Sequence, residues 1–140
     1  MKGFQYLIKP FSENAEQQSV VNYLKTVYPN VLFTTGLLGI HLPEWAMWLL
    51  VTLGYKAGTP DILIFEPRGM HHGLMMEMKR PRSEYMENGK KKIKYQGKLS
   101  DEQKAVLNEL QKRGYYIAVC YCYDEAKRVI DEYLVKDGNR

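Results

Sequence analysis

The sequence predicts an α/β protein in which a mixed central β-sheet is flanked by α-helices. Short segments rich in β-branched and aromatic residues alternate with segments that repeat apolar residues at helical spacing. A helix predicted at 101–113 stands between two of the strands and forms a crossover between them. The 140 residues, 45% of them hydrophobic, can bury one core, so we expect a single domain over residues 1–140.

The first helix is predicted to run from an N-cap at Ser12 to about Val27. Glu16 falls on the buried face of this helix, which is costly for an acid that has no partner. Another group pairs with Glu16, or its carboxylate simply accepts a hydrogen bond, or Glu16 lies just beyond the apolar stripe near the helix N-terminus, where acids are favoured. The apolar stripe of the helix comprises Val20, Tyr23, Leu24 and Val27.

A second helix is predicted from Pro43 to Leu53, with proline at a favoured first position. Because it is apolar almost all round, it is either a core helix or a helix whose Trp45 or Trp48 contributes to a subunit interface. Its apolar window is about half the length that spans a bilayer, so we expect no membrane partner and a cytoplasmic location.

Two strands, Asp61 to Phe65 and Leu74 to Met78, are predicted on either side of the turn "EPRGMHHG". Asn88-Gly89 then predicts the turn of a basic hairpin inserted at about 82–98.

The C-terminal part of the chain predicts a helix, a strand and a second helix. Ser100 and Gln103 form a capping box that opens a helix ending at Gly114. The segment 115–123 is almost continuous in β-formers, which favours a central strand that buries Cys120 and Cys122 as small apolar residues. Asp124 is predicted to cap the last helix.

Three charged residues are predicted to form one cluster. Glu77 and Lys79 lie two apart in a strand and so project from the same face. If the two strands pair as a hairpin, Asp61 lies beside them. Two neighbouring carboxylates repel, and oxygen ligands without thiolate or imidazole favour Mg²⁺ or Mn²⁺. Alternatively, Asp61 caps a turn and Glu77 pairs with Lys79 at a sheet edge.

The positive charge of the chain is concentrated in one stretch. The net charge is +4, while residues 80–98 carry seven basic and two acidic residues, a local +5. This pattern is typical of a phosphate-binding surface, or else of a solvated loop that lysines keep soluble. The basic residues are Arg80, Arg82, Lys90, Lys91, Lys92, Lys94 and Lys98.

The order and spacing of five motifs resemble the PD-(D/E)xK nuclease superfamily and, within it, a small stand-alone VRR-NUC domain of phage type. The motifs are "ENAEQQ" with Glu16, "AGTPD" with Asp61, "EMKRP" with Glu77 and Lys79, "LSDEQ" with Gln103, and "GYYIAV". The resemblance implies a restriction-endonuclease-like fold. It also implies divalent-metal-dependent hydrolysis of DNA phosphodiesters, with a homodimer acting on branched DNA such as four-way junctions or flaps.

The resemblance also assigns roles to individual residues. Asp61 and Glu77 would bind the metal together with the backbone carbonyl of Met78, and Glu16 would bind it directly or through water. Lys79 would be the catalytic lysine, and Gln103 would approach the site from its helix start, a position that its capping box explains equally well.

The alternatives are a repair- or restriction-type nuclease of low structure selectivity and a DNA-binding module without turnover. The segment between "KRP" and "LSDEQ" is longer than in the shortest family members, so its hairpin would contact DNA or a second subunit. A phage-encoded protein would act in the host-cell cytoplasm.

Overall fold

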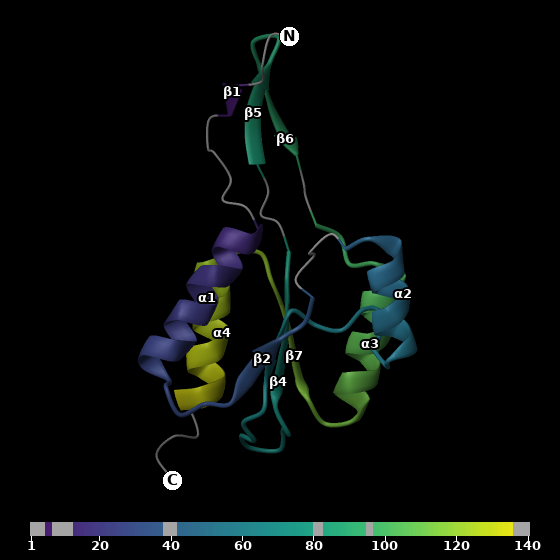
Figure 1. Ribbon diagram of the computed structural model, residues 1–140. Coiled ribbons are helices and arrows are strands. Elements are labelled where there is room, and N and C mark those ends of the chain that lie inside the picture. Colours follow the sequence, from purple (N-terminus) through teal and green to yellow (C-terminus); the bar gives the residue numbers. More distant parts are fainter. Residues whose placement is uncertain (1–4, 7–12, 38–41, 80–82, 95–96, 136–140) are drawn as a thin grey trace.

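Two β-sheets and four helices make up the computed structural model, which describes residues 5–6, 13–37, 42–79, 83–94 and 97–135 (Figure 1). The helices are α1 (Glu13–Val27), α2 (Glu44–Thr52), α3 (Asp101–Lys112) and α4 (Tyr123–Val135). The strands are β1 (Gln5–Tyr6), β2 (Phe33–Thr35), β3 (Ile62–Ile64), β4 (Leu74–Met78), β5 (Ser83–Glu87), β6 (Lys90–Lys94) and β7 (Tyr116–Cys120).

The larger sheet has the strand order β2-β3-β4-β7 and is mixed, as predicted. β2 and β4 pair antiparallel with β3, whereas β4 and β7 pair parallel across the α3 crossover. The prediction that β7 is central is wrong, since it lies at the edge of the described sheet. Its continuous apolar run is explained by α3 and α4, which pack against it. β2 was not predicted.

Helices cover both faces of this sheet, with α1 and α4 on one side and α2 and α3 on the other (Figure 1). The main core lies on the α1/α4 side, where Ile62, Met76 and Met78 pack against residues of both helices. Because side chains alternate along a strand, Asp61 and Glu77 project towards the α3 side instead. The sheet thereby separates the apolar core from the charged residues.

The predicted helix boundaries hold closely for α1 and α3, although Ser12 lies outside the described residues. The capping box at Ser100 and Gln103 is confirmed. The prediction for Asp124 is wrong, because α4 already begins at Tyr123 and Asp124 lies within its first turn. Cys120 is buried, whereas Cys122 follows the end of β7 and is only half-buried.

Helix α2 is not a core helix, which corrects one of the two interpretations of its sequence. None of its nine residues is buried, and Trp45 and Trp48 are 70% and 69% exposed. Pro43 and Leu53 flank the helix as its caps. An apolar helix this exposed is unusual for a soluble protein and indicates an interaction surface.

The smaller sheet, with the order β1-β5-β6, forms an arm that extends away from the rest of the chain (Figure 1). β5 and β6 pair antiparallel around Asn88 and Gly89, as predicted, and both turn residues have positive φ (52° and 73°). β1 pairs with β5 and was not predicted. The arm begins a few residues after the end of β4 and therefore lies near the charged end of the larger sheet.

Candidate active site

The buried carboxylates Asp61 and Glu77 lie side by side at one end of the larger sheet. The β3–β4 register pairs Ile62 with Met76, which brings the preceding Asp61 opposite Glu77, as predicted. Asp61 is 7% exposed and Glu77 only 2%. The backbone N–H of Met78 donates a hydrogen bond of 2.8 Å to Oδ2 of Asp61, which fixes the orientation of this carboxylate.

The electrostatics of the pair favour a positive partner. Burial raises the pKa of Asp61, while the hydrogen bond from Met78, a hydrogen bond with Glu77 and the charge of Lys79 act in the opposite direction without cancelling it. The pKa of Tyr55 is also raised, first by burial and then by the charges of Asp61 and Glu77. A proton or a cation would therefore stabilise the pair.

Lys79 and Gln103 complete a network of polar contacts around Glu77. Nζ of Lys79 donates a hydrogen bond of 2.8 Å to Oε1 of Gln103 and lies 3.7 Å from Oε1 of Glu77. Nε2 of Gln103 donates to the same Glu77 oxygen at 2.9 Å. The backbone N–H of Lys79 continues the pairing with β7 by donating to Cys120 O at 2.8 Å.

Gln103 belongs both to this network and to the start of α3. Its Oε1 accepts a hydrogen bond of 2.9 Å from the backbone N–H of Ser100, and its own backbone N–H donates to Ser100 Oγ at 3.1 Å. Gln103 therefore forms the predicted capping box and also contacts the charged cluster, while its catalytic role stays a prediction. The capping box fixes the side-chain amide in the place where it contacts Lys79 and Glu77.

Glu16 lies apart from this cluster. Its Oε2 accepts a hydrogen bond of 2.6 Å from the backbone N–H of Tyr123 at the start of α4. This agrees with the interpretation in which the Glu16 carboxylate simply accepts a hydrogen bond. Among the residues that the structure describes, no three or more His, Cys, Asp or Glu side chains gather as they would around a metal ion. The metal-binding role of Glu16 remains a prediction.

The next residue, Gln17, contacts the backbone of Asp61 instead and was not singled out from the sequence. Gln17 is 4% exposed, and its Nε2 donates to the backbone oxygen of Asp61 at 3.5 Å. Gln17 lies three residues before Val20 and seven before Leu24, so the helical periodicity of the apolar stripe of α1 already placed Gln17 on the buried face.

The predicted phosphate-binding lysines lie on and next to the arm. Lys90, Lys91 and Lys92 are exposed on β6, and Lys92 forms an ion pair with Glu87. Lys94 ends β6, and Lys98 is exposed between the arm and α3. Arg80 and Arg82 lie outside the described residues.

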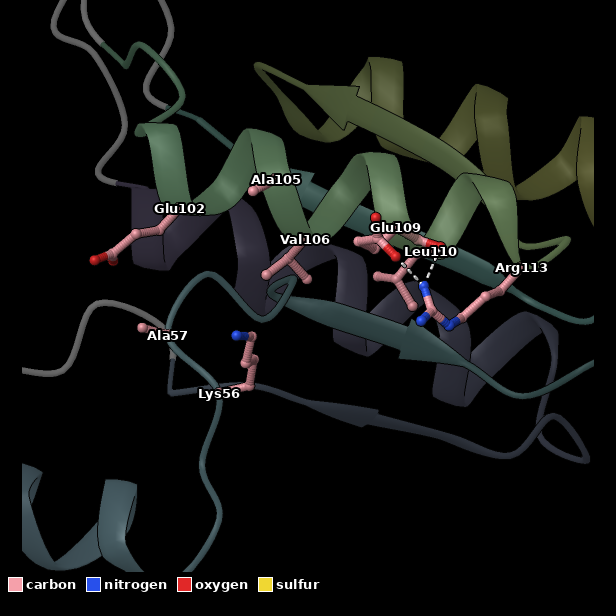
Figure 2. Close-up of a pocket in the computed structure, with 8 residues that line it drawn as sticks. All are labelled: Lys56, Ala57, Glu102, Ala105, Val106, Glu109, Leu110 and Arg113. Atoms are coloured by element: carbon pink, nitrogen blue, oxygen red, sulfur yellow. Dashed lines mark hydrogen bonds and ion pairs between the residues drawn. The ribbon is translucent and has the colours of Figure 1, made fainter.

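A separate groove of about 580 Å³ lies between α3 and the loop before β3 (Figure 2). Val106 and Leu110 of α3 line it, and Lys56 and Ala57 of the loop before β3 lie across from them. The groove does not include the charged cluster, but it shares Glu102 with the first turn of α3. The described part of the chain contains no helix long and apolar enough to cross a membrane.

The mixed sheet and the Asp61, Glu77 and Lys79 cluster at its end are the features of a nuclease-type α/β domain. The VRR-NUC domain profile matches residues 17–124, and the chain accordingly belongs to the VRR-NUC family. Family membership points to DNA as the substrate. The matched region contains Asp61, Glu77, Lys79 and Gln103 but begins one residue after Glu16.

A solved structure described as a VRR_NUC domain protein is similar over almost the whole chain. It is 25% identical, covers 91% of each chain and superposes with a TM-score of 0.63. The restriction-endonuclease-like fold expected from the sequence is therefore confirmed. No curated protein sequence matches the chain.

Proposed function

We propose that this domain is a divalent-metal-dependent DNA endonuclease that hydrolyses phosphodiester bonds in branched DNA. The observation that carries this proposal is the buried Asp61 and Glu77 pair with Lys79 and Gln103 beside it. A fold alone does not define a function, whereas two buried carboxylates next to an ammonium group form a site with definite chemistry.

The residues of the site fit Mg²⁺ or Mn²⁺. Carboxylate and carbonyl oxygens are the ligands that these ions prefer. Burial raises the pKa of Asp61, and the neighbouring groups that stabilise its negative charge do not cancel this effect, so a cation would stabilise the ionised carboxylate. Asp61, Glu77 and the carbonyl of Met78 would hold the ion, and Glu16 would reach it through water. The bound ion would supply a Lewis acid at the scissile phosphate.

The side chains of the protein would orient the reaction around the phosphate. In hydrolysis a water oxygen bonds to phosphorus and loses a proton to solvent, while the bond from phosphorus to the leaving oxygen breaks and that oxygen takes up a proton. The ammonium group of Lys79 would orient that water and stabilise the negative charge that develops on the phosphate oxygens. Gln103 would hold Lys79 in place through its 2.8 Å hydrogen bond.

The arm would bind the DNA backbone close to this site. The arm joins the chain between β4 and α3, and its lysines lie on β6, which extends away from the larger sheet (Figure 1). Lysine contacts to phosphates supply affinity without reading bases, so we expect little sequence specificity and a strong dependence on salt.

A homodimer would explain selectivity for branched DNA. One active site cuts one strand, so symmetric cleavage of a four-way junction requires two sites related by a twofold axis. The exposed apolar surface of α2, with Trp45 and Trp48, supports an interface between two copies of the chain.

The proposal is tested by a cleavage assay in Mg²⁺ and in Mn²⁺ with labelled four-way junction, flap, linear duplex and single-stranded DNA. Asp61→Ala is the inactive control, and Glu132→Gln, an exposed carboxylate change on α4, is the matched active control. Metal-dependent, symmetric cuts in the junction are expected. Equal cutting of all four substrates would indicate a general nuclease, and binding without cutting would indicate a binding module.

A further inference from the structure

The loop before Asp61 makes one unusually close contact with the start of α3. A Cβ atom on Gly58 would lie 2.6 Å from the carbonyl oxygen of Glu102 and 3.0 Å from the backbone nitrogen of Gln103. These neighbours are backbone atoms of a helix and cannot rotate away as a side chain would. Gly58 also has a φ of 87°, in the left-handed region that favours glycine.

The peptide group that Gly58 touches is the one that leads into Gln103. The side chain of Gln103 is held by the capping box on one side and contacts Lys79 and Glu77 on the other. Any displacement of the first turn of α3 would therefore move the amide away from Lys79. Figure 2 shows Ala57, the neighbour of Gly58, lying beside the first turn of α3, from which Glu102 projects.

The same loop also leads directly to the carboxylate pair. Asp61 follows Gly58 by three residues, and a short turn closed by a hydrogen bond of 2.6 Å from Thr59 Oγ1 to Lys56 O holds the loop. At Gly58, the loop that leads to Asp61 thus contacts the turn of α3 that carries Gln103.

We infer that Gly58 is a positioning residue, which seats the first turn of α3 and thereby sets the contact of Gln103 with Lys79 and Glu77. The inference deepens the proposed function and rests on it for its kinetic test. Gly58 fulfils this role because it has no side chain, so the loop can pack directly against the backbone of Glu102 and Gln103.

Gly58→Ala is the direct test, and Gly54→Ala is its matched control. Gly54 has a comparable φ of 113°, but a Cβ there would meet nothing within 4 Å. Both variants bear the strain of an L-residue in the left-handed region, and only Gly58→Ala clashes with α3. We expect kcat on cleavable DNA to fall on the order of 10²-fold in Gly58→Ala with KM nearly unchanged. Equal kcat values for the two variants would overturn the inference.

A double-mutant cycle with Gln103→Ala separates positioning from a general structural effect. If Gly58 acts through Gln103, Gly58→Ala costs little further activity once the Gln103 amide has been removed. Fully additive losses would contradict the inference. Thr59→Val loosens the same loop without adding volume, and it should lower kcat in the same direction by a smaller factor, even if Gly58→Ala fails to fold.

A readout without catalysis keeps this inference distinct from the proposed function. The side-chain amide signals of Gln103, identified by their loss in Gln103→Ala, can be followed by ¹⁵N–¹H NMR in the metal-free protein. They should shift in Gly58→Ala and stay in place in Gly54→Ala. Unmoved signals in a folded Gly58→Ala would refute the positioning role, whereas failure of the wild-type protein to cleave DNA would refute the proposed function alone.

Discussion

Replacing Asp61 with Asn should stabilise the metal-free protein while abolishing its activity. The Oδ1 atom of Asn can still accept the hydrogen bond from the N–H of Met78, and its NH₂ group can donate towards Glu77. The substitution removes one negative charge from a pair that is 7% and 2% exposed. The site would thus be optimised for binding a cation and not for stability.

The size of the gain follows from the repulsion within the pair. Two carboxylates about 4 Å apart repel by about 4 kcal/mol at an effective dielectric constant of about 20. Lys79, whose Nζ lies 3.7 Å from Glu77, offsets part of this repulsion. We therefore expect Asp61→Asn to raise the free energy of unfolding by about 1 to 3 kcal/mol.

The gain should depend on pH in a defined direction. Burial raises the pKa of Asp61 in the folded protein, so the folded state holds this proton more tightly than the unfolded state does. The stability that Asp61 contributes is present below its unfolded pKa and is lost as the pH rises through its folded pKa. The difference between Asp61→Asn and wild type should be small near pH 4 and grow towards neutral pH.

Urea unfolding with and without Mg²⁺ is the assay. Magnesium at about 100 times its dissociation constant would stabilise the wild-type protein by about 2.7 kcal/mol and Asp61→Asn by far less, so the stability advantage of Asp61→Asn shrinks strongly or reverses. Glu132→Gln should behave like wild type in both conditions. A metal-free Asp61→Asn that is less stable than wild type, or one that gains equally from Mg²⁺, would refute the reasoning.

Three further predictions concern other parts of the molecule. Changing residues 90–92 from Lys to Ala should weaken DNA binding and lower the slope of log affinity against log salt by about 2 to 3. Lys112→Ala on α3 is the control and should leave both unchanged. A slope equal to that of the wild-type protein would show that the arm does not bind DNA. Trp48→Lys should convert a dimer to a monomer in sedimentation experiments, and identical masses would exclude α2 from the interface. Burial and a hydrogen bond to Asp131 raise the pKa of Tyr23 to about 12, so stability should fall as the pH rises from 10 to 12. Asp131→Asn should reduce that dependence, which urea unfolding across this pH range would detect.

The carboxylate pair could be predicted because local rules determine it. Strand alternation places Glu77 and Lys79 on one face, and the antiparallel pairing of two neighbouring strands brings Asp61 to the same end. Gln103 could be located for a similar reason, since a capping box specifies a helix start from four consecutive residues.

The features that were missed depend on tertiary packing. Adjacent helical residues point about 100° apart, so the rotation of α1 against the sheet decides whether Glu16 or Gln17 approaches Asp61. Hydropathy alone likewise could not place α2, because an apolar helix is covered either by its own chain or by a partner. The apolar run of β7 indicates that helices cover both faces of this strand. An edge strand covered by α3 and α4 meets that condition as well as a central strand does, so the sequence did not determine the position of β7 in the sheet.

The double use of Gln103 connects the stability of a helix to the chemistry of the site. Its Oε1 accepts from both the Ser100 backbone and the Lys79 ammonium, while its Nε2 donates to Glu77. Fraying of the first turn of α3 would therefore release the lysine contact at the same time as the capping box. Because Gly58 packs against this turn, the loop that delivers Asp61 also restrains the helix that orients Lys79. Sites built from separate elements require such a junction, since each side chain must be held to a fraction of an ångström relative to the others.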